Sequence, residues 1–502
     1  MVELTTLQMV RLLLVVAALS ALTYVALRPR TVWSVIGRFL SHRCHAFTLG
    51  VLRILLFARL YQVGSSIQVA ALTEAPAQTR NLPAGWGWLG ELVPLFDGDF
   101  ANAARSLFLA ATLFAILGAA TYLTAPLSAL LGVYVLGLPN FFAKINHGEH
   151  LLACFCLILA FSRSGDGCSV DALVSGARQR RWSLSSTNTR SLAYGLPIRL
   201  CWLVMGLAYF FPGLYKSWNA GDQWLDGSAL QAIAYDKLAN LPDFRPIIVI
   251  YDSPNLLAFL GTATLFFELG FIFLLLNRRF WWIAPLVGLS FHVGLAYSIG
   301  IMPWGIVKVY WVFIDFAAIL CLWRRRLPRR LVDLLGIAED PSPAESSQSS
   351  QAEPRWGVSA TAGGTLIGLM LFTGMAGIDS FPVAVFPRFD ARVAPGADVR
   401  PTRYVLHTQR PDDDSEEVSQ KQLPPQVRRA RWDRILKNLG RAVGAERRAQ
   451  YRSIGELLTQ GGHRFEPGER LILYREYLRF DPESHSRVVE DRRTVSTYDV
   501  AR

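Results

Sequence analysis

Two ionisable residues interrupt strongly apolar stretches of the chain and are the first candidates for chemistry. Glu268 lies in the middle of the run 254–276, and His292 lies in the middle of the run 281–300. A charged group at membrane depth is costly, so such residues either relay protons, contact a polar ligand or form a buried pair that fixes helix packing. Consecutive antiparallel helices can bring Glu268 and His292 together. Spacing alone leaves the functional and the structural interpretation open.

A lysine and a histidine at the ends of other apolar runs form a second candidate site. Lys216 ends the sixth apolar run, and Asn146 and His147 open the fifth. A terminal lysine usually anchors a helix at the membrane surface, and a terminal histidine is usually solvated. Only six of the 51 basic residues are lysines, however, and only a lysine readily loses its proton to act as a base. Lys144 and Lys308 occupy similar positions, so this argument does not single out Lys216.

Aromatic residues are frequent in the loops on the same predicted side of the membrane. Trp86, Trp88, Trp218 and Trp224 lie in these loops, and Tyr215 precedes the terminal lysine. They could line a pocket for a flat, quinone-like ligand, and Trp218, Trp224 and Tyr215 are the candidates for that role. Aromatic residues in such positions more often form an interfacial belt, so both interpretations stay open.

The composition indicates which elements must position these residues. Apolar residues make up 52% of the 502 residues and charged residues 18%, against about 25% charged in ordinary globular proteins. With a mean hydropathy of +0.27, this excludes a soluble enzyme, a disordered protein and a disulfide-stapled module. The net charge of +12 is interpreted as cytoplasmic anchoring charge, not as a nucleic-acid surface. The six cysteines follow no metal-ligand spacing, so no metal is expected.

Ten apolar runs predict about ten transmembrane helices. The first is interpreted as a retained helix, because no small-residue cleavage site precedes the arginines that follow it. The fifth is short for a span. The runs lie near 7–27, 46–72, 104–123, 125–143, 148–163, 193–215, 254–276, 281–300, 305–323 and 358–378.

Arginine clusters beside these runs set the predicted orientation. If all ten runs span, the four clusters fall on one side, which the positive-inside rule makes cytoplasmic. The cytoplasmic segments are then 28–45, 164–192, 277–280 and 324–357, and everything after 378 lies outside. The Arg- and Ala-rich composition is typical of a GC-rich bacterial genome, so the predicted location is a bacterial cytoplasmic membrane.

The chain is predicted to have five parts. Ser, Gln, Pro and Glu dominate residues 338–355, which predicts a disordered linker. The tail has strand-like runs at 404–406, 471–478 and 488–500 and helix-like runs around 428–438 and 445–459. The predicted parts are an extra N-terminal transmembrane helix with a cytoplasmic segment (1–43), a membrane domain (44–330), a cytoplasmic linker (331–357), a last transmembrane helix (358–378) and an extracytoplasmic α+β domain (379–502).

Five sequence blocks resemble the membrane domain that vitamin K-dependent gamma-carboxylases share with bacterial proteins carrying the horizontally transferred transmembrane (HTTM) domain. They occur in the family's order within residues 44–330, which is more specific than any one block. The blocks are LGVLRILLFARL (49–60), NHGEHLL (146–152) with GDGCSVDAL (165–173), YFFPGLYKSWNAGDQWLDGSAL (209–230), FFELGFIFLL (266–275) and FHVGLAYSIG (291–300).

The resemblance implies roles that spacing does not. Lys216 matches the lysine that deprotonates the reduced naphthoquinone, after which oxygen adds and the product removes a γ-proton from glutamate. His147 matches the histidine implicated in stabilising the carbanion or its carboxylation by CO2. Asn146 would support these two residues, and Glu268 and His292 would be structural or would handle protons. The implied cofactor is a reduced, vitamin K-type naphthoquinone.

The chain also departs from the family's eukaryotic members. Those carboxylases have a long luminal region that recognises propeptide and glutamate, whereas about 120 residues follow the last apolar run here. The segment SFPVAVFPRFD (380–390) resembles the one that follows the last span in some bacterial HTTM proteins. Bacterial members can keep the quinol chemistry without carboxylating a substrate, so the acceptor and the use of CO2 stay open.

The sequence therefore predicts an all-α polytopic membrane protein with a small C-terminal extracytoplasmic α+β domain. The leading hypothesis is a carboxylase-like, lyase-type membrane enzyme that uses a reduced quinone and oxygen on an acidic peptide or protein at the outer face. The alternative is a non-catalytic membrane partner in peptide maturation or export. A transporter is less favoured, because no span shows a broken-helix repeat. The environment of Lys216 separates the first two hypotheses, because an enzyme needs it in a closed pocket and a partner leaves it facing solvent or headgroups.

Overall fold

The computed structural model describes most of the 502-residue chain. The described residues are 5–74, 80, 82–83, 86–141, 147–178, 183–185, 190–240, 247, 249–250, 253–300, 304–323, 326, 328, 332, 334–335, 356–378, 380–382, 402–412, 415–419, 422–423, 430–481 and 486–500. The candidate residue Asn146, the side chain of Trp88 and the predicted linker 338–355 lie outside this part of the chain.

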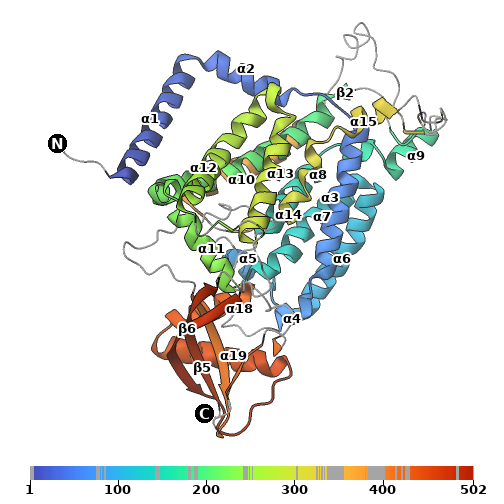
Figure 1. Ribbon diagram of the computed structural model, residues 1–502. Coiled ribbons are helices and arrows are strands. Elements are labelled where there is room, and N and C mark those ends of the chain that lie inside the picture. The colour runs from blue at the N-terminus through green and yellow to red at the C-terminus, as the bar shows by residue number, and fades with distance from the viewer. Residues whose placement is uncertain are drawn as a thin grey trace.

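Helices form the larger part of the molecule, as Figure 1 shows. They are α1 (Thr6–Leu27), α2 (Pro29–Leu40), α3 (Ala46–Ser66), α4 (Val69–Thr73), α5 (Trp86–Leu92), α6 (Gly98–Leu117), α7 (Thr121–Gly137), α8 (His150–Ala160), α9 (Val170–Arg178), α10 (Leu192–Leu225), α11 (Ser228–Asn240), α12 (Pro254–Leu276), α13 (Ile283–Ile299), α14 (Trp304–Val307), α15 (Phe316–Trp323) and α17 (Trp356–Ala376). Short 3-10 turns are η2 (Leu138–Phe141), η3 (His147–Glu149), η4 (Ser164–Asp166), η5 (Arg278–Phe280) and η6 (Tyr310–Phe313), and β1 (Cys44–His45) pairs antiparallel with β2 (Arg190–Ser191).

All ten predicted apolar runs contain helix, but not all of them are long enough to cross a bilayer. Within the described residues, seven helices are long and apolar enough to span a membrane. An eighth span results if α14 and η6 count together with α15, from which they are bent by 61°. The runs 148–163 and 281–300 give shorter apolar helices, of which α8 has 11 residues and α13 has 17. The protein is thus a polytopic helical membrane protein, and the number of helices that cross the bilayer stays a prediction.

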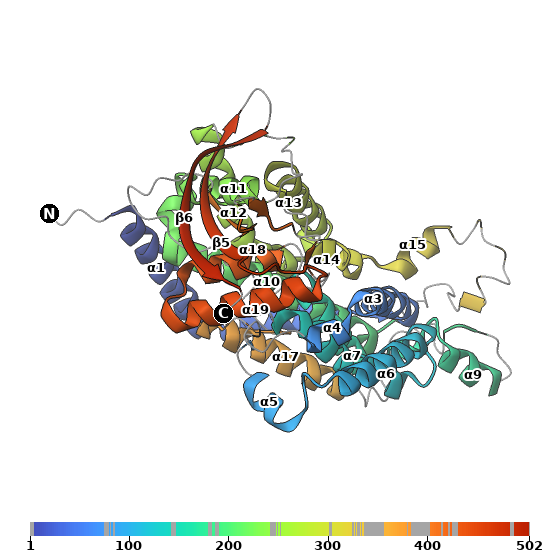
Figure 2. The same cartoon turned by 90° about the horizontal axis from the view of Figure 1, so that it is seen from below.

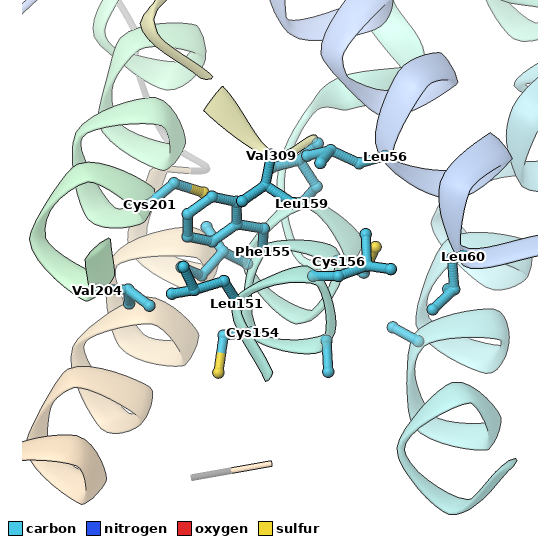
Figure 3. Packing of buried hydrophobic residues seen from close by; sticks show 14 of the residues in the cluster. Leu56, Leu60, Leu151, Cys154, Phe155, Cys156, Leu159, Cys201, Val204 and Val309 are labelled. Atoms are coloured by element: carbon cyan, nitrogen blue, oxygen red, sulfur yellow. The ribbon is translucent and has the colours of Figure 1, made fainter. Parts of the chain in front are cut away.

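The short helix α8 lies in the middle of the bundle. Nearly all of its side chains are buried, and an apolar helix buried on all sides belongs in a protein interior. In Figure 3, Phe155 and Leu159 of α8 lie between Leu56 of α3 and Cys201 of α10, and Leu151 lies beside Val204. A helix enclosed by other helices need not match the bilayer thickness, which explains why this run is shorter than a span.

A buried arginine joins α3 to the turn after α8. Arg53 is fully buried and donates hydrogen bonds to the carbonyl oxygens of Ser164 (2.6 Å), Gly167 (3.2 Å), Ile116 (3.4 Å) and Cys168 (2.6 Å). Carbonyls at helix ends and turns lack backbone partners, and the guanidinium supplies them. Both terminal nitrogens of this buried cation therefore have acceptors, whereas its Nε has none among the described residues.

The longest helix, α10, departs most from the sequence prediction. The apolar run ends at residue 215, but α10 continues through the polar stretch that follows and ends at Leu225. Its backbone leaves helical geometry at Ala220, where φ is −143°. Lys216 therefore lies inside a helix and not at the end of one, so the interpretation as a terminal anchor is wrong.

The C-terminal part forms a separate α+β unit. Its antiparallel sheet has the strand order β4-β3-β5-β6, with β3 (Thr402–Gln409), β4 (Ser415–Glu417), β5 (Arg470–Asp481) and β6 (Ser486–Asp499). Helices α18 (Ala430–Arg441) and α19 (Gly444–Gln460) share a core with it that includes Leu436, Leu458 and Leu473. The strand-like and helix-like runs predicted in the tail are confirmed.

The two ends of the molecule differ in what they carry. In Figure 1, α2, β2 and α9 lie at one end of the bundle, and α4, α5, α11 and the sheet lie at the other. Figure 2, seen from the sheet side, places β5 and β6 across the ends of α11 and α12. Lys437 of α18 bonds Asp236 of α11 at 2.8 Å. Predicted cytoplasmic and outer segments thus separate to opposite ends, while the orientation in a membrane stays a prediction.

Candidate functional site

A buried ion pair joins α10 to α12 at the predicted base. Nζ of Lys216 donates a hydrogen bond to Oε1 of Glu268. Lys216 is only 3% exposed and Glu268 only 6% exposed. Because neither side chain reaches solvent, the charge on each is balanced by the other and not by water.

Glycine allows the two helices to come close enough for this pair. A Cβ built at Gly213 would lie 2.8 Å from Cβ of Glu268 and 3.1 Å from the backbone nitrogen of Leu269, so no larger residue fits there without movement. Small residues at a helix contact let the backbones approach. Lys216 lies three residues further along α10 and therefore on nearly the same face, opposite Glu268.

Trp224 covers the other side of the lysine. Nζ of Lys216 lies 4.9 Å from the centre of the Trp224 ring, which is a cation–π arrangement. The irregular backbone at Ala220 turns the end of α10, and Gly261 of α12 leaves room for the carbonyl of Trp224. The two tryptophans of the predicted pocket thus differ, because Trp218 instead packs its ring 5.5 Å from Arg11 of α1 and accepts a hydrogen bond from it.

Two polar atoms beside Lys216 are buried and have no hydrogen-bond partner within the described part of the chain. They are Oε2 of Glu268 and Nε1 of Trp224. Buried polar atoms in native proteins are nearly always paired, so such orphan atoms need a ligand or water. One is an acceptor and the other a donor, and both lie next to a group that can carry a proton. The arrangement therefore offers one hydrogen-bond acceptor and one donor beside the lysine.

His292 belongs to a different network. Its Nε2 lies 2.5 Å from the hydroxyl of Tyr209, which lies 2.8 Å from the hydroxyl of Tyr310. Glu268 bonds Lys216 and His292 bonds Tyr209, so the predicted pairing between Glu268 and His292 is wrong. Each residue instead pairs with α10, because α10 lies closely against α12 and also reaches α13 through Tyr209.

The predicted histidine site lies in the turn before α8. His147 opens η3, and its ring centre lies 4.8 Å from that of His150, which is fully buried. His150 is in turn 4.8 Å from Phe381, just after α17. Glu149 pairs with Arg59 of α3 at 2.9 Å. The role of His147 stays a prediction, and Asn146 precedes the described turn.

Tyr215 fixes the end of α17. Its hydroxyl donates to the carbonyl oxygens of Gly374 (3.0 Å) and Met375 (3.2 Å). Of the three candidate pocket residues, Trp224 is thus the one whose ring is placed over Lys216.

Sequence reasoning missed three residues near the candidate site. Tyr209, Tyr310 and His150 lie within or beside apolar runs, where aromatic residues resemble ordinary core residues. One signal was available, since Tyr209 precedes Lys216 by seven residues, or about two helical turns. Within the described residues, no group of three or more His, Cys, Asp or Glu side chains is placed to hold a metal ion.

Comparison with known families places these residues in one domain. Residues 89–317 match the family model of the HTTM domain. The HTTM segment therefore runs from α5 to α15 and includes His147, Lys216, Glu268 and His292. Four of the five blocks lie within it, whereas the block at 49–60 precedes it. No curated protein and no solved structure is similar enough to be matched to this chain.

Proposed function

We propose that this protein is a quinol-dependent, carboxylase-like membrane enzyme in which Lys216 is the base. The HTTM domain is a membrane domain of carboxylase-like proteins, and it holds Lys216 in this chain. The observation that carries the proposal is the enclosed Lys216–Glu268 pair with an orphan donor and an orphan acceptor beside it. Burial of Lys216 favours an enzyme over a non-catalytic partner, because a partner needs no buried base.

The orphan atoms fit a reduced quinone. When bound, a reduced naphthoquinone supplies the electrons that react with oxygen to give a base strong enough to remove a γ-proton from glutamate. Oε2 of Glu268 can accept a hydrogen bond from a ring hydroxyl, and Nε1 of Trp224 can donate one to a ring oxygen. The flat indole provides an apolar wall on the same side.

Lys216 and Glu268 have different roles in proton transfer. Lys216 in the ion pair carries the proton and cannot accept another. Transfer of that proton from Nζ to Oε1 of Glu268 leaves a neutral amine facing Trp224, which is the form able to take a hydroxyl proton. Glu268 thus positions the amine and accepts its proton across a single hydrogen bond. His147, with Asn146 beside it, would act on the substrate that is modified.

The orientation of the chain supports a substrate at the outer face. Lys216 lies in the half of α10 that leads to α11 and the C-terminal sheet, whereas the described arginines that flank the apolar runs, such as Arg30 in α2 and Arg278 after α12, lie at the other end. The positive-inside rule then places the sheet outside a bacterial cytoplasmic membrane. A peptide or protein carrying acidic side chains would approach from that side, and the quinol would enter from the lipid.

The test is oxygen consumption and quinone-epoxide formation by purified protein supplied with reduced naphthoquinone, beside Lys216→Ala. Lys237→Ala is the matched control, since it removes a lysine of the partly exposed helix α11 in the same domain. Epoxide from the native protein and from the control, but not from Lys216→Ala, supports the proposal. No epoxide from folded native protein, even with glutamyl peptide added, would overturn it and favour the membrane-partner alternative.

A further inference from the structure

A second buried cation lies on α10, towards the end of the bundle opposite the C-terminal sheet. Arg199 is 1% exposed, and three aromatic rings surround its guanidinium. The central carbon lies 3.5 Å from the ring centre of Trp281, 3.8 Å from that of Trp202 and 5.2 Å from that of Phe39. The two indole rings stand at 87° to each other, so the cation occupies the angle between them.

The aromatic cage leaves the hydrogen-bonding capacity of Arg199 unused. A guanidinium has five N–H donors, which lie in its plane, and ring faces attract the charge without accepting most of these bonds. Arg199 donates no hydrogen bond to any described residue, and its Nε and Nη1 are enclosed without a partner. Asp315, a carboxylate at the same end of the bundle, bonds Thr48 and pairs with Arg190 instead.

Arg53 shows what a purely structural arginine looks like in the same protein. It is as deeply buried as Arg199, and its Nε likewise has no partner among the described residues, but four carbonyl oxygens accept hydrogen bonds from its two terminal nitrogens. An enclosed cation without an anion or an acceptor is costly. Because no described residue supplies an acceptor to these nitrogens of Arg199, the difference points to a partner that is an anion with several acceptor oxygens.

The surroundings of the cage are basic and partly open. Arg278 is exposed and starts the turn that leads to Trp281. His42, between α2 and β1, is half-buried with its ring 5.4 Å from that of Trp281. Burial and then the charge of Arg199 lower the pKa of His42 to about 4, so this histidine adds no charge at neutral pH. An incoming anion would meet Arg278 first and then the edge of Arg199.

The level of the cage is that of a membrane surface. The helix α2 crosses this end of the bundle in Figure 1 and has an apolar face and a polar face, as helices in the interface do. Trp33 on α2 and Trp282, next to the cage, are both about two-thirds exposed, as in an interfacial aromatic belt. At this depth the abundant anion with acceptor oxygens is the phosphate of a lipid headgroup.

We propose that Arg199 and Arg278 bind the phosphate of an anionic phospholipid, with Trp202 and Trp281 holding the guanidinium that contacts it. The phosphate oxygens would accept from the N–H groups that find no acceptor among the described residues, in the bidentate geometry that arginine favours. This site is separate from the candidate base and does not depend on the proposed enzyme activity. It would fix the α12–α13 turn against α2 and the start of α10.

The test is lipid binding by delipidated, purified protein, measured by native mass spectrometry with phosphatidylglycerol, phosphatidylcholine or inorganic phosphate. Charge-assisted hydrogen bonds are worth enough that Arg199→Gln should weaken phosphatidylglycerol binding by at least about tenfold. Arg279→Gln is the matched control, because it removes the same charge from the neighbouring exposed position and should bind as the native protein does. Arg278→Gln serves as a second variant if Arg199→Gln does not fold, and should also bind more weakly.

Three outcomes would overturn the proposal. Phosphatidylglycerol binding that is unchanged in both Arg199→Gln and Arg278→Gln would remove the site. Equal weakening by Arg279→Gln would show only a diffuse charge effect. Inorganic phosphate that binds as tightly as the lipid, and competes with it, would assign the site to a free anion and not to a headgroup.

Discussion

The ion pair between α10 and α12 allows the sharpest test of the site. Lys216→Met leaves the carboxylate of Glu268 without its cation, and Glu268→Leu leaves the ammonium without its anion. The side chains of Lys216 and Glu268 are only 4% and 8% exposed, so water cannot take the place of the missing partner. Removing one member of such a pair costs roughly 3–5 kcal/mol of folding free energy. Each single variant should therefore lose about that much stability.

The double variant should recover most of the loss. Replacing Lys216 and Glu268 together by Met and Leu removes both charges and keeps apolar side chains of similar volume between the helices. Exchanges of this kind are commonly neutral or stabilising, so the double variant should lie within about 1–2 kcal/mol of the native protein. The stability loss of the double variant should then be several kcal/mol smaller than the sum of the two single losses, as expected for residues in direct contact.

The assay is reversible unfolding in detergent micelles, followed by tryptophan fluorescence. The pair Arg470–Asp499 of the sheet, with both side chains at least half exposed, gives a matched control in which the same exchanges should couple by no more than about 1 kcal/mol. Single variants at Lys216 and Glu268 that cost less than about 1 kcal/mol, or costs that add, would refute the argument. In that case water would reach the two side chains, and the argument that Lys216 is an enclosed base would fail.

Three further predictions concern other contacts. Tyr209→Phe removes a hydroxyl that bonds two buried groups and should cost about 1–3 kcal/mol in the same unfolding assay, and an unchanged midpoint would contradict the network. Burial lowers the pKa of His407 below its usual value of about 6.5, so the unfolded chain binds the proton more tightly than the folded sheet does. The sheet should therefore lose stability as the pH falls below about 6.5. The pH dependence of proteolysis of the C-terminal part measures this, and His407→Gln should flatten it. Lys437→Gln breaks a partly exposed contact with Asp236 that is worth at most about 1 kcal/mol. The unfolding midpoint of the membrane domain should therefore stay unchanged, while proteases should release the sheet faster. A large drop in that midpoint would contradict this value.

The apolar helices could be predicted from the sequence, because each lies in an apolar run, whereas α2, α9 and α11 lie in segments that were predicted only as loops. What could not be predicted was the end of α10. Residues 217–225 contain Asn, Asp and Gln and resemble a loop, yet they continue the helix because Trp224 packs against α12 and Lys216 finds its anion there. The stabilisation from these tertiary contacts outweighs the low helix preference of the polar stretch. Lys216 is therefore enclosed within a helix, although the sequence predicted it at a helix end.

The pairing of the ionisable residues could not be predicted either. Glu268 and His292 are both buried and hydrogen-bonded, as polar residues within apolar helices must be, and their functional role stays a prediction. Which partner each takes depends on the rotation of the helices about their axes, and that is set by features such as the glycine at Gly213. Arg199 was not singled out at all, since an arginine near the start of a span resembles ordinary anchoring charge until its missing acceptors are seen.

The polar groups of α10 have a common structural origin. Arg199, Tyr209 and Lys216 are separated by about 15 Å and about 10 Å along the helix axis, so they lie at three depths in the bundle. Each meets a partner from α12, from α13 or from the turn between them. A shift of these two helices along α10 would have to break all three contacts together. The packing of α12, α13 and the turn between them against α10 therefore explains more than the position of one lysine, because it also sets the depth of Arg199 and Tyr209.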